Sequence, residues 1–118
     1  MADMAQAAQQ MASLSHEEMQ ANAGEATRLL KALANEHRLM VLCALAEGEH
    51  SVGELNEVVP LSQSALSQHL ARLRSDGLVS TRREAQAVYY SLGEPLAARI
   101  VELLHAHYCR PRPARRRR

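Results

Sequence analysis

Residues 62–92 carry the pattern that most restricts how this chain can fold. A polar-faced helix comes first, Gly77 ends it, and two strand-forming stretches follow. Within the helix, Leu66, Leu70 and Leu73 recur at spacings of four and three residues, so one narrow apolar stripe faces a core. A helix, a glycine stop and a hairpin in this order are typical of a winged DNA-binding domain.

The outward face of this helix carries short hydrogen-bonding side chains and little charge. Side chains of this kind suit base edges and phosphate oxygens in a major groove. The alternative is a plain solvated face, but such helices usually carry Lys and Glu, which residues 62–71 lack. We therefore predict that DNA is contacted by Ser62 (also the expected N-cap), Gln63, Ser64, Ser67, Gln68, His69 and Arg72.

A short helix is predicted just upstream. Ser51 and Glu54 form an S-x-x-E capping box, and Pro60 ends the helix. Together with the polar-faced helix it makes a helix-turn-helix. Its apolar face is expected to consist of Val52, Leu55, Val58 and Val59.

A hairpin is predicted just downstream. Residues 78–83 and 87–92 carry the β-branched and tyrosine side chains that favour strands, with residues 84–86 as the tip. Arg82 and Arg83 lie where a wing approaches phosphates, a contact that positions a protein on DNA without reading its sequence. The alternative is two exposed arginines on an ordinary hairpin.

Composition indicates one small domain. The chain has 118 residues, 47% of them hydrophobic, with no Phe or Trp, so its core must rely on Leu, Val, Ala and Met. Residues 1–57 hold nine acids and three bases, whereas residues 58–118 hold four acids and eleven bases, so the predicted DNA-facing half is basic. Without a basic leader, and with residues 39–46 as the longest apolar run, we predict a cytoplasmic protein that does not enter a membrane.

Three parts are expected along the chain. Residues 1–14 form a flexible segment, residues 15–109 a DNA-binding and dimerisation domain, and residues 110–118 a basic, disordered tail. The domain is expected to begin with a helix whose pairing seam consists of Met19, Ala23, Ala26, Leu30 and Leu33. Its capping box is Ser15 and Glu18.

Two further helices complete the domain. Asn35 is the expected N-cap of a helix that stops near Gly48, with an inner face of Leu39, Leu42, Cys43 and Ala46. Pro95 opens the last helix, which is apolar over a broad arc and needs a large partner surface. The first and last helices together suit a symmetric dimer interface.

These motifs together resemble the ArsR/SmtB family of bacterial winged-helix repressors. The resemblance lies in LLKALANEHRLMVLCAL at 29–45, SVGEL at 51–55, and residues 61–92, and it covers about residues 15–109. It implies a mainly α winged helix-turn-helix with a small β-hairpin, in the order of four helices, two strands and a last helix. It also implies a homodimer, paired through the first and last helices, that represses transcription on double-stranded operator DNA until an inducer releases it.

The family's usual metal sites match this chain poorly. The cysteine pair of its arsenic or cadmium class would fall within residues 51–59, which contain no cysteine. His105 and His107 of the last helix are about 200° apart around an α-helix, so both cannot readily serve one ion. We predict no metal and no cofactor, and keep a metal-responsive repressor that uses last-helix histidines as the alternative.

Cys43 and Cys109 indicate a different trigger. The sulfide-, persulfide- and redox-responsive branch of this family resembles the chain in having one thiol at each of these places. The resemblance implies that reactive sulfur species or oxidants link the two sulfurs within one subunit, as a disulfide or polysulfide bridge, and that DNA affinity then falls. Alone, Cys43 reads as a small buried hydrophobe, whereas Cys109, beside Arg110, reads as an accessible thiol whose thiolate is favoured.

The residues bear on two other classes of function. An enzyme is not predicted, because no nucleophile motif, glycine-rich cradle or acid/base pair accompanies the cysteines. A protein-interaction module that kept the winged fold but lost DNA binding remains open, because fold alone does not fix function.

Overall fold

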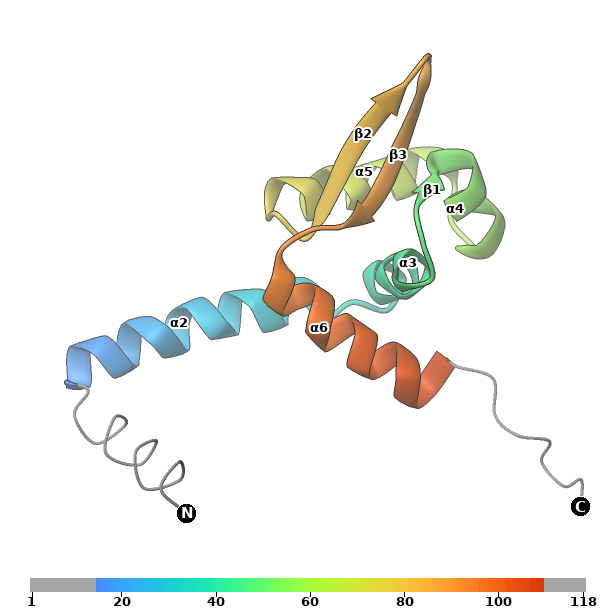
Figure 1. The fold of residues 1–118 in the computed structure, drawn as a ribbon. Coiled ribbons are helices and arrows are strands. Elements are labelled where there is room, and N and C mark those ends of the chain that lie inside the picture. Colours follow the sequence, from blue (N-terminus) through green and yellow to red (C-terminus); the bar gives the residue numbers. More distant parts are fainter. Residues whose placement is uncertain (1–14, 110–118) are drawn as a thin grey trace, which may run out of the picture. The chain divides into compact units, whose positions relative to one another are not determined.

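The computed structural model describes residues 15–109 (Figure 1). The predicted flexible segment 1–14 and basic tail 110–118 lie outside the described residues, so the proposed domain boundaries stay predictions. The chain divides between Lys31 and Ala32 into two compact units. The elements of the described part are α2 (His16–Leu33), α3 (Glu36–Ala46), β1 (His50–Ser51), α4 (Val52–Val58), α5 (Gln63–Ser75), β2 (Val79–Glu84), β3 (Ala87–Leu92), α6 (Pro95–Leu104) and the π-helix η1 (His105–Cys109).

Helix α2 makes up nearly all of the described part of the first unit. Its predicted capping box is present: the Glu18 N–H donates to Ser15 Oγ and the Ser15 N–H donates to Glu18 Oε1, both at 3.0 Å. Met19 and Leu30 of the predicted seam are about half exposed, at 50% and 56%. Leu33, the last residue of that seam, is instead buried in the core at 4% exposure, so the predicted seam was one residue too long. Dimer pairing through the exposed part stays a prediction.

Caps set the helix boundaries of the second unit as the sequence predicts. The side chains of Asn35, Ser51 and Ser62 each accept a hydrogen bond from the backbone N–H three residues later, at 3.0 to 3.2 Å. Gly77 has the predicted left-handed conformation, with φ +78°. The buried apolar core of this unit consists of Ala32, Leu33, Val41, Leu42, Leu45, Leu55, Val59, Leu66, Leu70, Leu73, Leu78, Val79, Ala97 and Val101.

The predicted hairpin is confirmed, but it belongs to a three-stranded antiparallel sheet in the order β1-β3-β2. The added strand pairs His50 with Tyr90 and Ser51 with Tyr89. Two residues have no readable period, so the sequence did not predict this strand. The hairpin projects beyond the helices of its unit (Figure 1). Its predicted tip was one residue too long, because Glu84 still pairs with Ala87.

Two predicted helix faces need correction. Val58 is 59% exposed, whereas Leu55 and Val59 of the same predicted face are buried. In α3 the fully buried positions include Val41 and Leu45, while Leu39, Cys43 and Ala46 are only partly buried. This helix is apolar nearly all round, so its sequence period could not show which side would face the core.

The last helix also differs from a uniform α-helix. Pro95 lies in the first turn as predicted, and Ala97 and Val101 are buried, but Leu96 and Leu103 are 53% and 71% exposed. From His105 the backbone continues as a π-helix, a form that often occurs at functional sites. No helix in the described range 15–109 is long and apolar enough to cross a membrane.

Candidate functional site

The outer face of α5 is open to solvent. Leucines of its inner face fix the helix to the core, since Leu66, Leu70 and Leu73 are at most 1% exposed. The hydroxyl oxygen of Ser62 also accepts from the Ala65 N–H, at 3.1 Å, as an N-cap. The predicted DNA-contacting residues that are exposed on this helix and its cap are Ser62, Gln63, Ser64, Ser67, Gln68 and Arg72.

His69 lies apart from this exposed set. Its side chain is partly buried, and its ring centre is 6.2 Å from that of His37 in α3. Burial lowers the pKa of His69, and the positive charges of Arg38 and His37 lower it further. The ring is thus held against α3, and a direct DNA contact by His69 stays a prediction.

The two arginines of strand β2 have different surroundings. Nε of Arg82 lies 2.8 Å from Glu49 Oε2, and an Nη atom of Arg82 lies 2.8 Å from Glu84 Oε1. The guanidinium also lies 4.8 Å above the Tyr89 ring. Hydrogen bonds to the two carboxylates raise the pKa of Arg82. Its charge is therefore already compensated within the protein.

Arg83 points to the opposite face of the same strand, because side chains alternate along a strand. It is exposed, and its guanidinium has no ion-pair partner among residues 15–109. Of the two arginines predicted to contact phosphate, Arg83 is the one whose charge is available.

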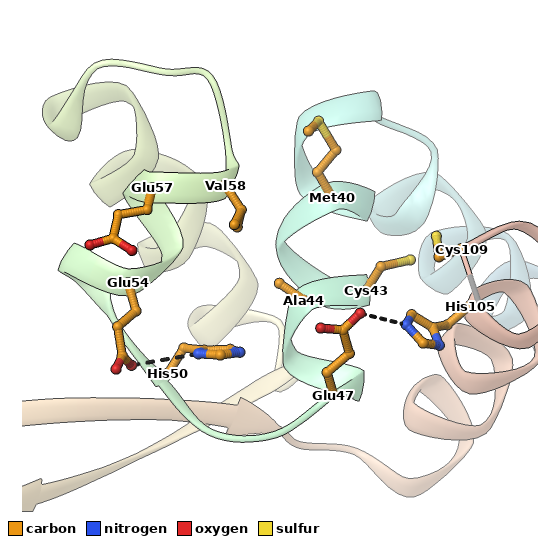
Figure 2. Close-up of a pocket in the computed structure, with 10 residues that line it drawn as sticks. All are labelled: Met40, Cys43, Ala44, Glu47, His50, Glu54, Glu57, Val58, His105 and Cys109. Atoms are coloured by element: carbon orange, nitrogen blue, oxygen red, sulfur yellow. Dashed lines mark hydrogen bonds and ion pairs between the residues drawn. The ribbon is translucent and has the colours of Figure 1, made fainter. Parts of the chain in front are cut away.

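Cys43 and Cys109 line one open pocket of roughly 500 Å³ (Figure 2). Cys43 comes from the middle of α3 and is partly buried, while Cys109 ends η1 and is exposed. In Figure 2 the Cys43 side chain points toward Cys109. The pocket is lined by Met40, Cys43, Ala44, Glu47, His50, Glu54, Glu57, Val58, His105 and Cys109. Two thiols that are distant in sequence are therefore neighbours in the fold.

The surroundings of Cys43 keep its sulfur protonated. Burial raises the pKa of Cys43 to about 11, helped by a hydrogen bond to Cys109, by the charge of Cys109 and by the Glu47 carboxylate. Thiolate is the nucleophilic form, so Cys43 is a poor nucleophile near neutral pH. Cys109 is the more exposed of the two thiols. Arg110, which was predicted to favour its thiolate, lies outside the described residues.

We expect alkylation of Cys43 to report this raised pKa. With limiting iodoacetamide and peptide mass spectrometry, the rate at Cys43 should rise about tenfold per pH unit from pH 8 to 10 and level off near pH 11, because thiolate is the reacting form. In urea the plateau should begin about two units lower, near the ordinary pKa of cysteine, roughly 8.5 to 9. A folded protein whose rate at Cys43 levels off below pH 9.5 would contradict the assignment.

The pair Glu47 and His105 stands beside the thiols. His105 Nε2 lies 2.9 Å from Glu47 Oε2, which connects the C-cap of α3 to η1 (Figure 2). His107 instead packs edge-on against Tyr108, with ring centres 4.6 Å apart. The two histidines are thus engaged separately, and no group of three or more His, Cys, Asp or Glu within residues 15–109 is arranged to hold a metal ion.

Sequence reasoning missed two carboxylates, Glu47 and Glu49. Both follow α3 in a short acidic stretch that looks like an ordinary solvated helix end. Their partners, His105 and Arg82, are 58 and 33 residues further along the chain. No local signal in the sequence could have identified these contacts.

The middle of the chain matches a known protein family. The model described as "Bacterial regulatory protein, arsR family" matches residues 35–81. This range covers α3, the helix-turn-helix and the start of β2.

Two curated relatives match most of the chain. "Transcriptional activator HlyU" of Vibrio cholerae is 55% identical over 98 residues, which are 83% of this chain and 91% of the relative. "Biofilm growth-associated repressor" of Agrobacterium fabrum is 50% identical over 93 residues, 79% of this chain and 80% of the relative.

Solved structures show the same architecture. Reduced HlyU from Vibrio cholerae has a TM-score of 0.75 and 56% identity, covering 80% of this chain and 99% of that one. A homodimeric winged helix-turn-helix DNA-binding domain from Mycobacterium bovis has a TM-score of 0.66 and 33% identity, covering 81% of this chain and 88% of that one. The helix-turn-helix and sheet described above are therefore a winged helix-turn-helix.

Proposed function

The chain belongs to the ArsR family of bacterial regulatory proteins, in the branch of HlyU and the biofilm growth-associated repressors, and from this we propose a thiol-controlled repressor. It is a transcriptional regulator with a DNA-binding fold and not an enzyme. We propose that its dimer holds operator DNA, in the cytoplasm, while Cys43 and Cys109 are reduced, and leaves it once they are linked. The observation that carries this proposal is that the two cysteines line one pocket.

Exposed polar side chains on α5 support the DNA-reading part of the proposal. Gln63 and Gln68 are long enough for bidentate contacts to base edges, and Ser64 and Ser67 suit phosphates or bases. Arg83 adds a phosphate contact from the wing. Since log affinity falls with log salt in proportion to phosphates neutralised, binding should depend strongly on salt.

We expect Arg83→Gln to reduce that salt dependence. The plot of log binding constant against log salt should become shallower by about one per subunit, because one phosphate contact is lost. Fluorescence anisotropy titrations between 50 and 300 mM salt measure the slope. Arg99→Gln removes the same charge from an exposed position on α6 that is not among the predicted DNA-contacting residues, and should leave the slope unchanged. Equal slopes for Arg83→Gln and the native protein would rule out a phosphate contact by Arg83.

A homodimer is proposed from the neighbours and from the last helix. The Mycobacterium bovis domain is described as homodimeric. Leu96 and Leu103 of α6 and Met19 and Leu30 of α2 are large apolar side chains at least half exposed. A symmetric dimer that buries these side chains would place its two α5 helices about 34 Å apart, so that they can enter successive major grooves.

The proposed chemistry is a two-step thiol–disulfide exchange with an organic disulfide or polysulfide as oxidant. Cys109 thiolate attacks one sulfur of the oxidant, whose S–S bond breaks and releases one thiolate. Cys43 then loses its proton to solvent, and its sulfur attacks Cys109 Sγ and displaces the second thiolate. The two cysteines lose two electrons, and the oxidant gains them and leaves as two thiols. When a polysulfide leaves a Cys109–S–S–R adduct, attack of Cys43 on the sulfur next to Cys109 Sγ would expel RS⁻ instead and keep that sulfur in the bridge.

The pKa of Cys43 makes this order of steps reasonable. A mixed disulfide at Cys109 carries neither a thiolate charge nor an S–H group. Two of the causes that raise the pKa of Cys43 then disappear, and burial and the Glu47 carboxylate remain. The first step therefore makes the second sulfur easier to ionise. Closing a loop of about 66 residues also constrains the unfolded chain by about 4 kcal/mol in the chain-entropy model, so the linked form need not be less stable.

A promoter-binding assay tests the proposal. In a gel, reduced protein should retard a DNA duplex from the region upstream of its own gene. An organic tetrasulfide, such as glutathione tetrasulfide, should release the duplex, and dithiothreitol should restore binding. If no salt-dependent binding is seen with the reduced protein, it has kept the fold as an interaction module. A reporter fused to that promoter separates repression from activation, because the two relatives carry opposite names.

A further inference from the structure

A three-residue segment between α3 and β1 reaches the thiol pocket through one of its glutamates and the wing through the other. Glu47 Oε2 lies 2.9 Å from His105 Nε2 in η1, and both residues line the pocket (Figure 2). Glu49 Oε2 lies 2.8 Å from Arg82 Nε in β2. Only Gly48 separates the two glutamates. We call Glu47, Gly48 and Glu49 the coupling segment.

We infer that the coupling segment transmits the thiol link to the wing, so that movement of η1 changes the position of Arg82 and with it the DNA-binding hairpin. This inference rests on the proposed thiol switch. It adds a route by which a link between Cys43 and Cys109 reaches the DNA-binding surface, and it gives functions to Glu47 and Glu49.

Both ends of the coupling segment are fixed to regular structure. The Glu47 and Gly48 N–H groups donate to Ala44 and Leu45 carbonyls at 3.1 Å, which hold the first end to α3. His50 follows directly and pairs with Tyr90 in the sheet. A tethered segment this short passes a displacement on instead of absorbing it.

Gly48 gives the segment its sharp turn. Its φ is +145°, a conformation that side-chain-bearing residues rarely adopt. The turn sends the two neighbouring carboxylates to different partners, one to η1 and the other to the sheet. The two contacts are therefore joined by a defined backbone geometry.

Arg82 is the receiving side chain. Its guanidinium is shared between Glu49 and Glu84 and lies over Tyr89, so these three groups fix its position. Of the two carboxylates, Glu84 is on β2 itself and moves with Arg82, whereas Glu49 belongs to the coupling segment. Arg82 is thus a positioning residue for the wing, and Arg83 remains the phosphate contact.

The test compares how far oxidation weakens DNA binding in matched variants. Kd for the promoter duplex is measured for reduced protein and for protein fully linked by tetrasulfide, with the link quantified by mass spectrometry in the same sample. If the native ratio of the two Kd values is about 100, Glu49→Gln should lower it to about 10, while reduced binding changes less than about threefold. Glu84→Gln removes the other carboxylate of Arg82 and should keep the native ratio.

A double-mutant cycle identifies the pair. Glu49→Gln with Arg82→Gln should lower the ratio no further than either change alone, because both remove one contact. Glu47→Gln removes the carboxylate that contacts His105 at the other end of the coupling segment, and it should also lower the ratio. This second variant keeps the test valid if Glu49→Gln folds poorly. A native ratio in linked Glu49→Gln or linked Glu47→Gln would overturn the coupling segment. A native protein that fails to link, or that links and stays bound, would instead overturn the proposed switch and this coupling with it.

Discussion

Replacing Gly93 with alanine is expected to lower the free energy of unfolding by about 3 kcal/mol. A Cβ on Gly93 would lie 2.6 Å from the Gly77 carbonyl oxygen and 3.1 to 3.2 Å from the carbonyl carbons of Val79 and Leu78. All three are backbone atoms, so no side chain can rotate away. Relief would separate the two ends of the hairpin and strain the bonds from Gly93 N–H to Leu78 O and from Glu94 N–H to Gly77 O, both 2.9 Å.

Thermal and urea unfolding at fixed protein concentration measure this effect. The melting temperature should fall by roughly 15 °C for a domain of this size. Gly24→Ala in α2 is the matched control: a Cβ there meets no atom within 4 Å, and alanine favours a helix interior by up to about 1 kcal/mol. A Gly93→Ala protein that melts within 3 °C of the native protein would show that the two backbone segments are not held this closely.

Cys109→Ser and Cys43→Ser should each abolish release of DNA by tetrasulfide. The native protein is expected to lose about 100-fold in operator affinity on oxidation, a coupling of about 2.7 kcal/mol. The mechanism needs both sulfurs, because the link joins α3 to η1. A serine hydroxyl forms no bond to sulfur under these conditions, so each variant should stop at a mixed disulfide at most.

Anisotropy titrations before and after tetrasulfide measure these variants. Both should bind the duplex within about twofold of the reduced native protein, with or without oxidant. Cys43→Ala, which removes the polar atom from a partly buried position, checks that any defect of Cys43→Ser is not one of folding. Release of Cys109→Ser by tetrasulfide would mean that Cys43 alone, or another group, is the sensor.

Local signals in the sequence predicted most of the fold. The capping boxes at Ser15 and Ser51 and the N-caps at Asn35 and Ser62 depend only on residues three positions apart, so the sequence contains them in full. The leucine stripe of α5 was equally clear. The features of the fold that the sequence did not predict depend on tertiary contacts. Strand β1, for example, exists only because β3 lies beside it.

The candidate site was less predictable than the fold. Nothing local indicates that Cys43 and Cys109 share a pocket, and their pairing came from a family resemblance alone. The charge of Arg82 is compensated by Glu49, which is 33 residues away in the chain. The sequence therefore could not show that, within residues 15–109, Arg82 is paired while Arg83 is not. His69 appeared to belong to the DNA-reading face, yet its ring lies near His37 of α3. Long-range contacts decided each of these points.

The thiol switch is tested most directly by the operator affinity of protein that carries the link. Protein treated with tetrasulfide is separated from unreacted protein, and non-reducing peptide mass spectrometry confirms one bridge between Cys43 and Cys109 within each protomer. Its Kd for the promoter duplex is then measured before and after dithiothreitol. We expect binding about 100-fold weaker in the linked form, with full recovery after reduction. A linked protein that binds the duplex as tightly as the reduced protein would contradict the thiol switch.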